Sequence, residues 1–247
     1  MILNFSKIDS AYLGKNGLLS CLMAKRFALN CLVIVAHPDD ETIWMGGTII
    51  RHPYWNWHIM SLCRTDDSDR SPRFHKVISE LGAVGYISDL DDSPTLAPLS
   101  ANLVEIKKRI QSISLKQFDL IFTHGPKGEY TRHLRHEQVH QAVREMVESG
   151  DLIGTALFFT YEDCSGECTP RPSEDAHIRI KLSSAEIDKK QHIIRDIYGF
   201  NEASFEYKSI GSVEAFFAHN IINLEHNRNI LDELNSPEGK SASTTTI

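Results

Sequence analysis

The sequence predicts an α/β fold in which helices cover both faces of a mostly parallel, doubly wound sheet. Apolar stretches of strand length alternate with stretches of helical spacing along most of the chain, an order typical of parallel sheets. Residues 31–36 form an unbroken apolar run rich in β-branched side chains. Such a run indicates a strand that is buried on both faces of the sheet. The predicted architecture is therefore Rossmann-like.

The expected elements follow one another along the chain. Strands are predicted over residues 31–36, 57–63, 84–88, 118–123, 156–161 and 178–182. Helices are predicted over residues 43–51, 73–81, 103–113, 134–148 and 183–198. Ser183 and Glu186 have the spacing of a capping box, and Gly82 is expected to end the second helix. Gly46 and Gly47 would let the first helix pack closely on the sheet.

Composition and length favour one large domain with extensions. The chain has 247 residues, of which 41% are hydrophobic, and a formal net charge of −7. We expect an N-terminal extension over residues 1–30 with a short helix over 18–29, a domain over 31–234, and a disordered tail over 235–247. An acidic chain without a basic run disfavours nucleic acid or an anionic membrane as the main partner.

The sequence also predicts a cytoplasmic protein. No apolar run approaches the ~18 residues that a membrane span needs. The weakly apolar residues 17–24 precede the basic Lys25 and Arg26, whereas a signal peptide has its charges first. An odd number of cysteines, five, without a zinc-like C-x-x-C pair favours a reducing compartment. Cys164 and Cys168 are close enough to be bridged but are expected to be free thiols.

Polar side chains follow the predicted strands where each strand ends. His37, Asp39, Asp40 and Glu41 come directly after the first strand, and residues 66–69, 91–92 and 124–136 follow later ones. Ligands of open α/β sheets bind beyond the carboxyl ends of the strands. Adjacent carboxylates repel unless a cation or proton intervenes, so a divalent metal would stabilise the first cluster. A helix N-cap with acidic first-turn residues also explains residues 39–41, but it does not explain His37.

Residues 124–140 contain four histidines and allow two different metal sites. Taken alone, His136-Glu137-Gln138-Val139-His140 fits the H-E-x-x-H pattern of zincin peptidases. On a helix both imidazoles could bind zinc and Glu137 could act as the base. This interpretation leaves the cluster after the first strand without a role. The alternative joins the two clusters into one site.

The joined interpretation rests on two motifs. Ala36-His37-Pro38-Asp39-Asp40-Glu41, after an apolar strand, resembles the A-H-P-D-D-E motif of the PIG-L / LmbE-like family of zinc-dependent N-acetylglucosaminyl deacetylases. Residues 128–136 stand where that family has a second motif close to G-x-Y-G-H-P-D-H. A weaker likeness is the lysine- and histidine-bearing stretch 189–192. The resemblance covers about residues 31–218, within the expected catalytic domain over 31–234.

The resemblance implies a role for each matching residue. The implied zinc ligands are His37, Asp40 and His136. Asp39 would be the general base, and His133 would polarise the substrate carbonyl or act as an acid. Tyr130 and Asp92 would bind substrate. The chain departs from the family at Arg135, where the second motif carries Asp, so that either Glu129 or Glu137 replaces this acid or His133 works differently.

Two histidines and one aspartate would leave a fourth position open for water, as in catalytic zinc sites. The predicted function is a zinc-dependent amide hydrolase that removes an acyl group, expected to be acetyl, from an N-acylated amino-sugar conjugate. A zinc-bound water activated by Asp39 would attack the amide. The substrate class comes from the resemblance. Two alternatives are a zincin-type metallopeptidase that uses His136, Glu137 and His140, and a non-enzymatic ligand-binding α/β domain.

Overall fold

The computed structural model describes residues 28–93, 99–162, 169–219 and 234. Most of the helix predicted over residues 18–29, the tail over 235–247, Cys164 and Cys168 lie outside these described residues. Within the described part of the chain, no helix is both long and apolar enough to cross a membrane.

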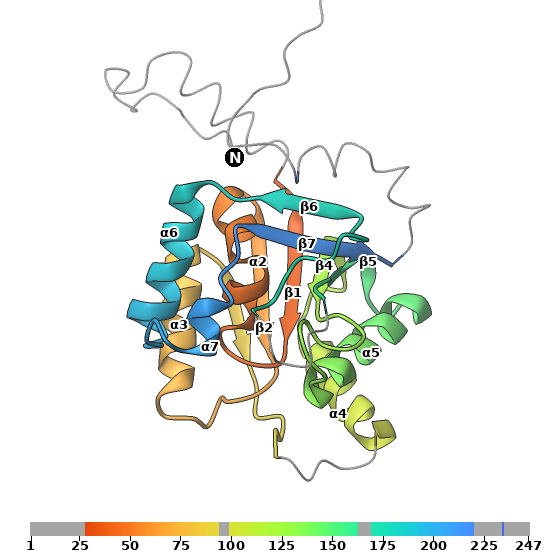
Figure 1. Ribbon diagram of the computed structural model, residues 1–247. Coiled ribbons are helices and arrows are strands. Elements are labelled where there is room, and N and C mark those ends of the chain that lie inside the picture. Colours follow the sequence, from red (N-terminus) through yellow and green to blue (C-terminus); the bar gives the residue numbers. More distant parts are fainter. Residues whose placement is uncertain (1–27, 94–98, 163–168, 220–233, 235–247) are drawn as a thin grey trace, which may run out of the picture.

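Seven strands of the described residues form one sheet in the order β3-β2-β1-β4-β5-β7-β6 (Figure 1). They are β1 (Asn30–Val35), β2 (Asn56–Ser61), β3 (Val84–Ile87), β4 (Gln117–Thr123), β5 (Ile153–Phe159), β6 (Ile178–Lys181) and β7 (Val213–Ala218). The first five pair in parallel, whereas β7 pairs antiparallel with both β5 and β6. The strand order reverses between β1 and β4, and ligands of such sheets bind at this reversal.

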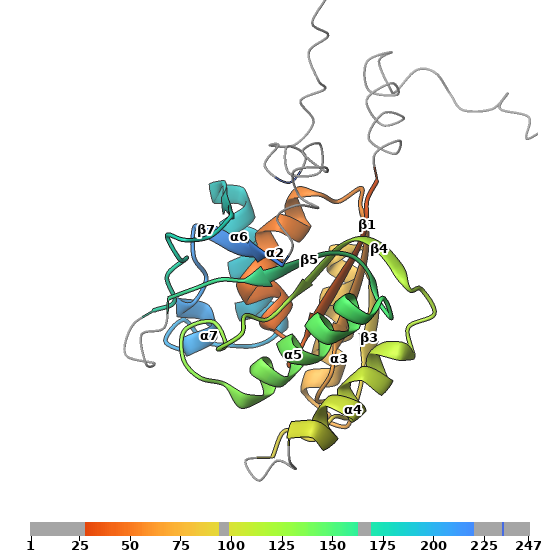
Figure 2. The ribbon, with the colours of Figure 1, turned by 90° about the vertical axis from the view of Figure 1, so that its right-hand side faces the viewer.

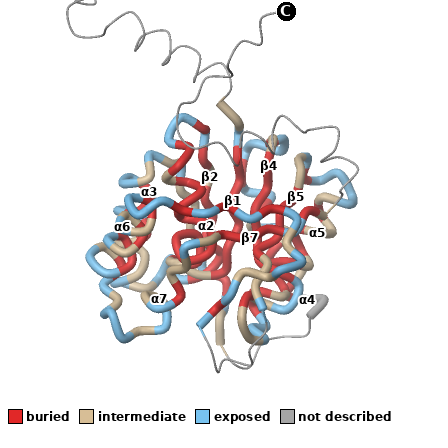
Figure 3. The backbone as a smooth tube through the Cα atoms, turned by 45° about the horizontal axis from the view of Figure 1, so that its top comes forward, coloured by how far each residue is buried: buried red, intermediate tan, exposed pale blue. Residues whose placement is uncertain are grey.

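Helices cover both faces of the sheet (Figure 2). They are α2 (Asp40–Arg51), α3 (Arg70–Leu81), α4 (Leu99–Gln111), α5 (Leu134–Ser149), α6 (Ser184–His192), a π-helix (Ile193–Ile197) and α7 (Phe205–Lys208). Alternate residues of β1 enter two cores, Val33 with α2 and α3, and Leu32 with α4 and α5. The strands at the middle of the sheet are buried almost continuously (Figure 3). The predicted fold class is confirmed.

Most predicted elements are present, with shifted ends. Both α2 and α3 begin three residues earlier than predicted. Gly82 ends α3 with a φ of 64°, and Ser183 and Glu186 form both bonds of a capping box. The predicted helix over 183–198 is α-helical only to His192 and then continues as the π-helix.

Two elements, α7 and β7, were not predicted. The apolar stretch of β7 is interrupted by Glu214, which is nevertheless fully buried. Its carboxylate accepts hydrogen bonds from the amides of Gly47 and Thr48 in α2 and from Nζ of Lys190 in α6. This buried network ties α2, which carries the first motif, to the antiparallel end of the sheet. Gly47 packs against Leu182 after β6, where a Cβ would lie 2.4 Å from a methyl carbon.

Candidate metal centre

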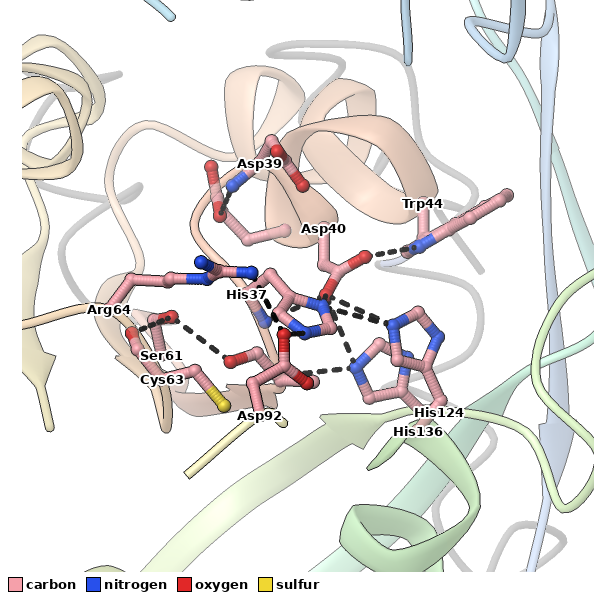
Figure 4. Close-up of polar contacts among 12 residues, drawn as sticks. His37, Asp39, Asp40, Trp44, Ser61, Cys63, Arg64, Asp92, His124 and His136 are labelled. Carbon is pink, nitrogen blue, oxygen red and sulfur yellow. Dashed lines mark hydrogen bonds and ion pairs between the residues drawn. The ribbon is translucent and has the colours of Figure 1, made fainter. Parts of the chain in front are cut away.

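The segments that follow β1 and β4, including the first turns of α2 and α5, bring the two predicted clusters together (Figure 4). Nδ1 of His37 lies 3.3 Å from Oδ2 of Asp40 and 3.3 Å from Nε2 of His136, and these last two atoms are 3.5 Å apart. The three predicted zinc ligands therefore form a nearly equilateral triangle of donor atoms. A tetrahedral zinc site with bonds of about 2.0–2.1 Å places its ligand atoms about 3.3–3.4 Å apart. The three distances are compatible with a tetrahedral zinc site.

The triangle attracts positive charge. Burial lowers the pKa of His37, but its contacts with Asp40 and Asp92 outweigh burial and raise the pKa to about 10. The pKa of Asp40 is held well below its usual range, since the nearby histidines outweigh the effect of burial. A proton can be shared among these three atoms, and a divalent cation would neutralise the carboxylate and bind all three, since they lie within 3.5 Å of one another.

Asp40 is held in place on both of its oxygens. The indole Nε1 of Trp44, one turn further along α2, donates to Oδ1 at 3.1 Å, and the amide of His37 donates to Oδ2 at 2.9 Å. Asp40 opens α2 and is almost completely buried. These bonds fix the rotamer of the carboxylate, so Oδ2 faces the two imidazoles.

Asp39 has a strained backbone. Its φ of 113° lies in a region that residues other than glycine rarely adopt. Its amide donates to Oε2 of the fully buried Glu41, whose other oxygen accepts from Tyr198 at 2.8 Å and from Thr42 at 2.6 Å. Glu41 therefore stabilises the loop. Strain of this kind is concentrated at functional sites, where the surrounding structure maintains it.

Glu129, between β4 and α5, holds two imidazoles. Its carboxylate lies 2.6 Å from Nδ1 of His136 and 2.9 Å from Nδ1 of His124. Burial raises the pKa of Glu129, but the two histidines outweigh it and lower the pKa to about 2. A carboxylate that accepts from Nδ1 leaves Nε2 of His136 as a bare donor atom for a metal.

His124 has no role in the sequence prediction, although its place directly after the predicted fourth strand was an available signal. Its Nε2 accepts the amide of Ala36 at 2.9 Å, so this lone pair is already used. Its ring stacks on His136 with centroids 3.8 Å apart, and His133 stacks on His136 at 4.1 Å. His124 thus supports the ring of His136 instead of competing for the metal.

Asp92, in the loop after β3, and Arg135, on α5 next to His136, lie beside the centre. Oδ2 of Asp92 lies 3.0 Å from Nε2 of His37 and 3.0 Å from Nη2 of Arg64. Arg135, which is buried, donates to Oε1 of Gln138 at 2.6 Å and to the carbonyl of Asp91. Arg135, which stands where the resembling motif carries aspartate, is therefore bound to the loop that carries Asp92.

The centre opens into a cavity of about 430 Å³, and Asp39, Tyr130 and His133 lie in its wall. Burial and the charge of Asp40 raise the pKa of Asp39 well above its usual range. Burial and the neighbouring His136 and His37 lower the pKa of His133 to about 4. Tyr130 stacks on Phe205 of α7 with ring centroids 4.3 Å apart. All of the predicted site residues thus gather at one cavity.

The H-E-x-x-H residues do not converge on a site of their own. Nδ1 of His140 bonds to the carbonyl of His124 at 2.9 Å, and its ring packs on Phe158. Glu137 is held by Arg132 at 2.5 and 2.6 Å. Groups of donor atoms within 4.8 Å of one another occur among the described residues, but neither His140 nor Glu137 belongs to one. The geometry favours the joined site.

The comparisons with known proteins agree with the motifs. Residues 32–147 match the family model described as PIG-L, GlcNAc-PI de-N-acetylase. This stretch contains all three donors of the triangle, and the predicted resemblance to the PIG-L / LmbE-like family is confirmed. A search of curated proteins gave no match.

Three solved structures share the fold at low sequence identity. N,N'-diacetylchitobiose deacetylase from Pyrococcus horikoshii is 17% identical with a TM-score of 0.56, covering 90% of this chain and 97% of that one. The conserved protein TT1542 from Thermus thermophilus is 16% identical with a TM-score of 0.54, covering 78% and 95%. The A40926 pseudoaglycone deacetylase Dbv21 is 10% identical with a TM-score of 0.52, covering 71% and 84%. The family and two of these three neighbours are deacetylases, so the chain has a deacetylase-like fold.

Proposed function

Because residues 32–147 of this chain match the PIG-L family, we propose that the protein is a zinc-dependent amide hydrolase. It removes an acyl group, acetyl in the simplest case, from the nitrogen of an amino-sugar conjugate. The observation that carries this proposal is the triangle formed by His37, Asp40 and His136, whose edges of 3.3 to 3.5 Å suit tetrahedral zinc. Three protein donors leave one position open, as catalytic zinc sites do.

His37, Asp40 and His136 would hold the metal. Zinc bound there lowers the pKa of a coordinated water to ~7 and polarises a carbonyl group. Proton transfer and polarisation of the substrate are then the tasks of the side chains in the cavity wall. Asp39, the residue next to the ligand Asp40, accepts a proton from the attacking water. Its strained backbone and the bond to Glu41 keep its position relative to the donors fixed.

His133 acts on the substrate from the same cavity. Its ring lies 5.2 Å from that of His37 between centroids, in an edge-on arrangement. The lowered pKa of His133 keeps its imidazole neutral near pH 7, so its N–H donates a hydrogen bond to the carbonyl oxygen as negative charge develops there. The proton that Asp39 has accepted from water then passes to the leaving amine. Stacking on His136 holds the ring in this position.

The substrate class is inferred from the family and from the shape of the cavity. A volume of about 430 Å³ lies in the range of ~300–1,000 Å³ that small-molecule sites have. Tyr130, Phe200 and Phe205 form an aromatic wall beside the polar centre, against which the apolar face of a sugar ring can pack. We assign substrate contact to Tyr130. Asp92 lines the same cavity and is a second candidate contact, although one of its oxygens already faces His37 and Arg64.

The test is amine release by the zinc-loaded protein. N,N'-diacetylchitobiose and other N-acetylglucosamine conjugates are supplied, and free amine and acetate are measured. Asp39→Asn should lower the rate by about 10²–10⁴-fold with zinc content unchanged. Asp69→Asn is the matched control, because this carboxylate faces Arg73 outside the cavity, and its rate should stay within about twofold. Full activity in Asp39→Asn would refute the role of the base, and no release from any amide by zinc-loaded wild type would refute the function.

A further inference from the structure

We infer that Arg135 is a positioning residue of the metal centre, which holds the loop after β3 so that Asp92 orients the ring of His37. The inference rests on the proposed function, because it gives Arg135 a task only if His37 binds a metal. It also accounts for an arginine at a position where the related motif carries aspartate.

Arg135 is built into the structure in a way that links two elements. Its side chain is 1% exposed, and arginine is almost never fully buried unless it is paired. One guanidinium nitrogen donates to Gln138 within the same helix, α5. Another donates to the carbonyl of Asp91 in the loop after β3. The second bond therefore fixes the position of that loop relative to the start of α5, which carries His136.

The residue after Asp91 is the one that meets His37. Oδ2 of Asp92 lies 3.0 Å from Nε2 of His37. Nε2 is buried, and among the described residues no group meets the angular requirement for a hydrogen bond to it. The Asp92 oxygen is thus close enough to Nε2 of His37 for a hydrogen bond, but its angle is unfavourable. A small displacement of the loop therefore decides whether this hydrogen bond forms. The exposed side chain of Arg64 contacts the same oxygen of Asp92 from the solvent side. The backbone of Arg64 has a positive φ of 76°.

The orientation of His37 matters because its two nitrogens do different work. Nδ1 faces Asp40 and His136 and must keep its lone pair to bind a metal, so Nε2 must carry the hydrogen. Metal-binding histidines commonly donate the other N–H to a carboxylate, which fixes the tautomer and the ring. Glu129 does this for His136, and Asp92 is placed to do it for His37. Arg135 holds the second of these carboxylates, Asp92, in place by donating a hydrogen bond to the backbone carbonyl of the preceding residue, Asp91.

The experiment is a double-mutant cycle on zinc affinity, measured by competition with a chromophoric chelator. Removal of groups that orient metal ligands typically weakens metal binding 10–100-fold. Arg135→Met and Asp92→Asn should each weaken zinc binding by about 10-fold or more, and the double variant should bind no more weakly than the weaker single variant. Arg135→Lys, which keeps a donor for the carbonyl of Asp91, should recover part of the loss. Arg144→Met is the matched control, because it is the same substitution on the same helix at a side chain that pairs with Glu148 and Gln141 outside the cavity, and its zinc affinity should stay within about twofold of wild type.

Each outcome bears on the inference. Wild-type zinc affinity in a folded Arg135→Met variant would overturn it, and so would losses for Arg135→Met and Asp92→Asn that multiply in the double variant. If Arg135→Met does not fold, the cycle is completed with Arg135→Lys, and multiplying losses there overturn the inference equally. Loss of zinc in Asp40→Ala with none in the Arg135 variants would refute the positioning role and leave the proposed function standing. No zinc binding by wild type would refute both.

Discussion

Replacing Glu129 by glutamine tests how the metal centre is held together. The carboxylate accepts from Nδ1 of both His124 and His136, and its Oε1 also accepts the amide of Gly125 at 3.2 Å. Glutamine has one oxygen and one NH₂ group. If the oxygen keeps the bonds to His124 and Gly125, the NH₂ group meets the N–H on Nδ1 of His136, and two donors then face each other.

One imidazole must change its tautomer to relieve this contact. His124 is prevented from doing so, because its Nε2 accepts the amide of Ala36 and a hydrogen there would leave that amide unpaired. His136 therefore moves its hydrogen to Nε2, which faces Asp40. Binding of zinc must then reverse this change and leave a buried donor unsatisfied, which costs about 1–3 kcal/mol. The affinity should fall by about 5- to 150-fold, since 1.4 kcal/mol corresponds to tenfold.

The assay is chelator competition for zinc on folded Glu129→Gln, with Glu137→Gln as the matched control. Glu137 bonds to Arg132 at the protein surface, so its substitution should change the affinity by less than about twofold. Wild-type affinity in Glu129→Gln would refute the tautomer argument. A larger loss in Glu137→Gln than in Glu129→Gln would support a zincin site instead.

Two further predictions concern stability. Lys190→Met removes the ammonium group that lies 2.7 Å from the carboxylate of the buried Glu214. It should lower the free energy of unfolding, measured by urea denaturation, by about 3–5 kcal/mol. A decrease of less than about 1 kcal/mol would contradict this. Burial raises the pKa of Glu186, but its bonds with Arg51 outweigh burial and lower it. The ionised Glu186 carboxylate therefore stabilises the folded state fully above the unfolded-state pKa of about 4.3. This stabilisation is lost as the pH falls below that value and then below the lower pKa of the folded state. The free-energy difference between wild type and Glu186→Gln should narrow on acidification from pH 7, and a widening difference would show that the sign is wrong.

The sequence allows the first half of the site to be predicted because its signals are local. An unbroken apolar run marks β1, and the side chains that follow it at once include His37, Asp39 and Asp40. The carboxyl ends of parallel strands meet at one edge, so the later cluster with His136 can be placed near them without knowing the strand order.

The support of these predicted ligands depends on contacts that the sequence does not reveal. The sequence offered Glu129 and Glu137 as acids that could replace the missing aspartate, and in the structure Glu129 bonds to two imidazoles whereas Glu137 bonds to Arg132. The choice between them depends on how the loop between β4 and α5 folds back. The indole of Trp44 bonds Asp40 one turn away, yet in the sequence it resembles an ordinary core residue. The positive φ of Asp39 likewise arises from the surrounding bonds and not from a glycine.

The antiparallel end of the sheet could not be predicted for a related reason. Glu214 interrupts the apolar run of β7, and a charged residue in that place argues against a buried strand. Its burial becomes understandable once Lys190, 24 residues earlier in the sequence, is seen to pair with it. Such a partner is visible only in the folded chain.

Zinc content per chain tests the central claim most directly, because it needs no knowledge of the substrate. Wild type, Asp40→Ala and His140→Ala are compared after their folding has been confirmed. The joined site predicts that Asp40→Ala loses zinc and that His140→Ala, whose imidazole bonds to the backbone of His124, keeps it. Loss of zinc in His140→Ala alone would place the metal on the H-E-x-x-H helix and contradict the account.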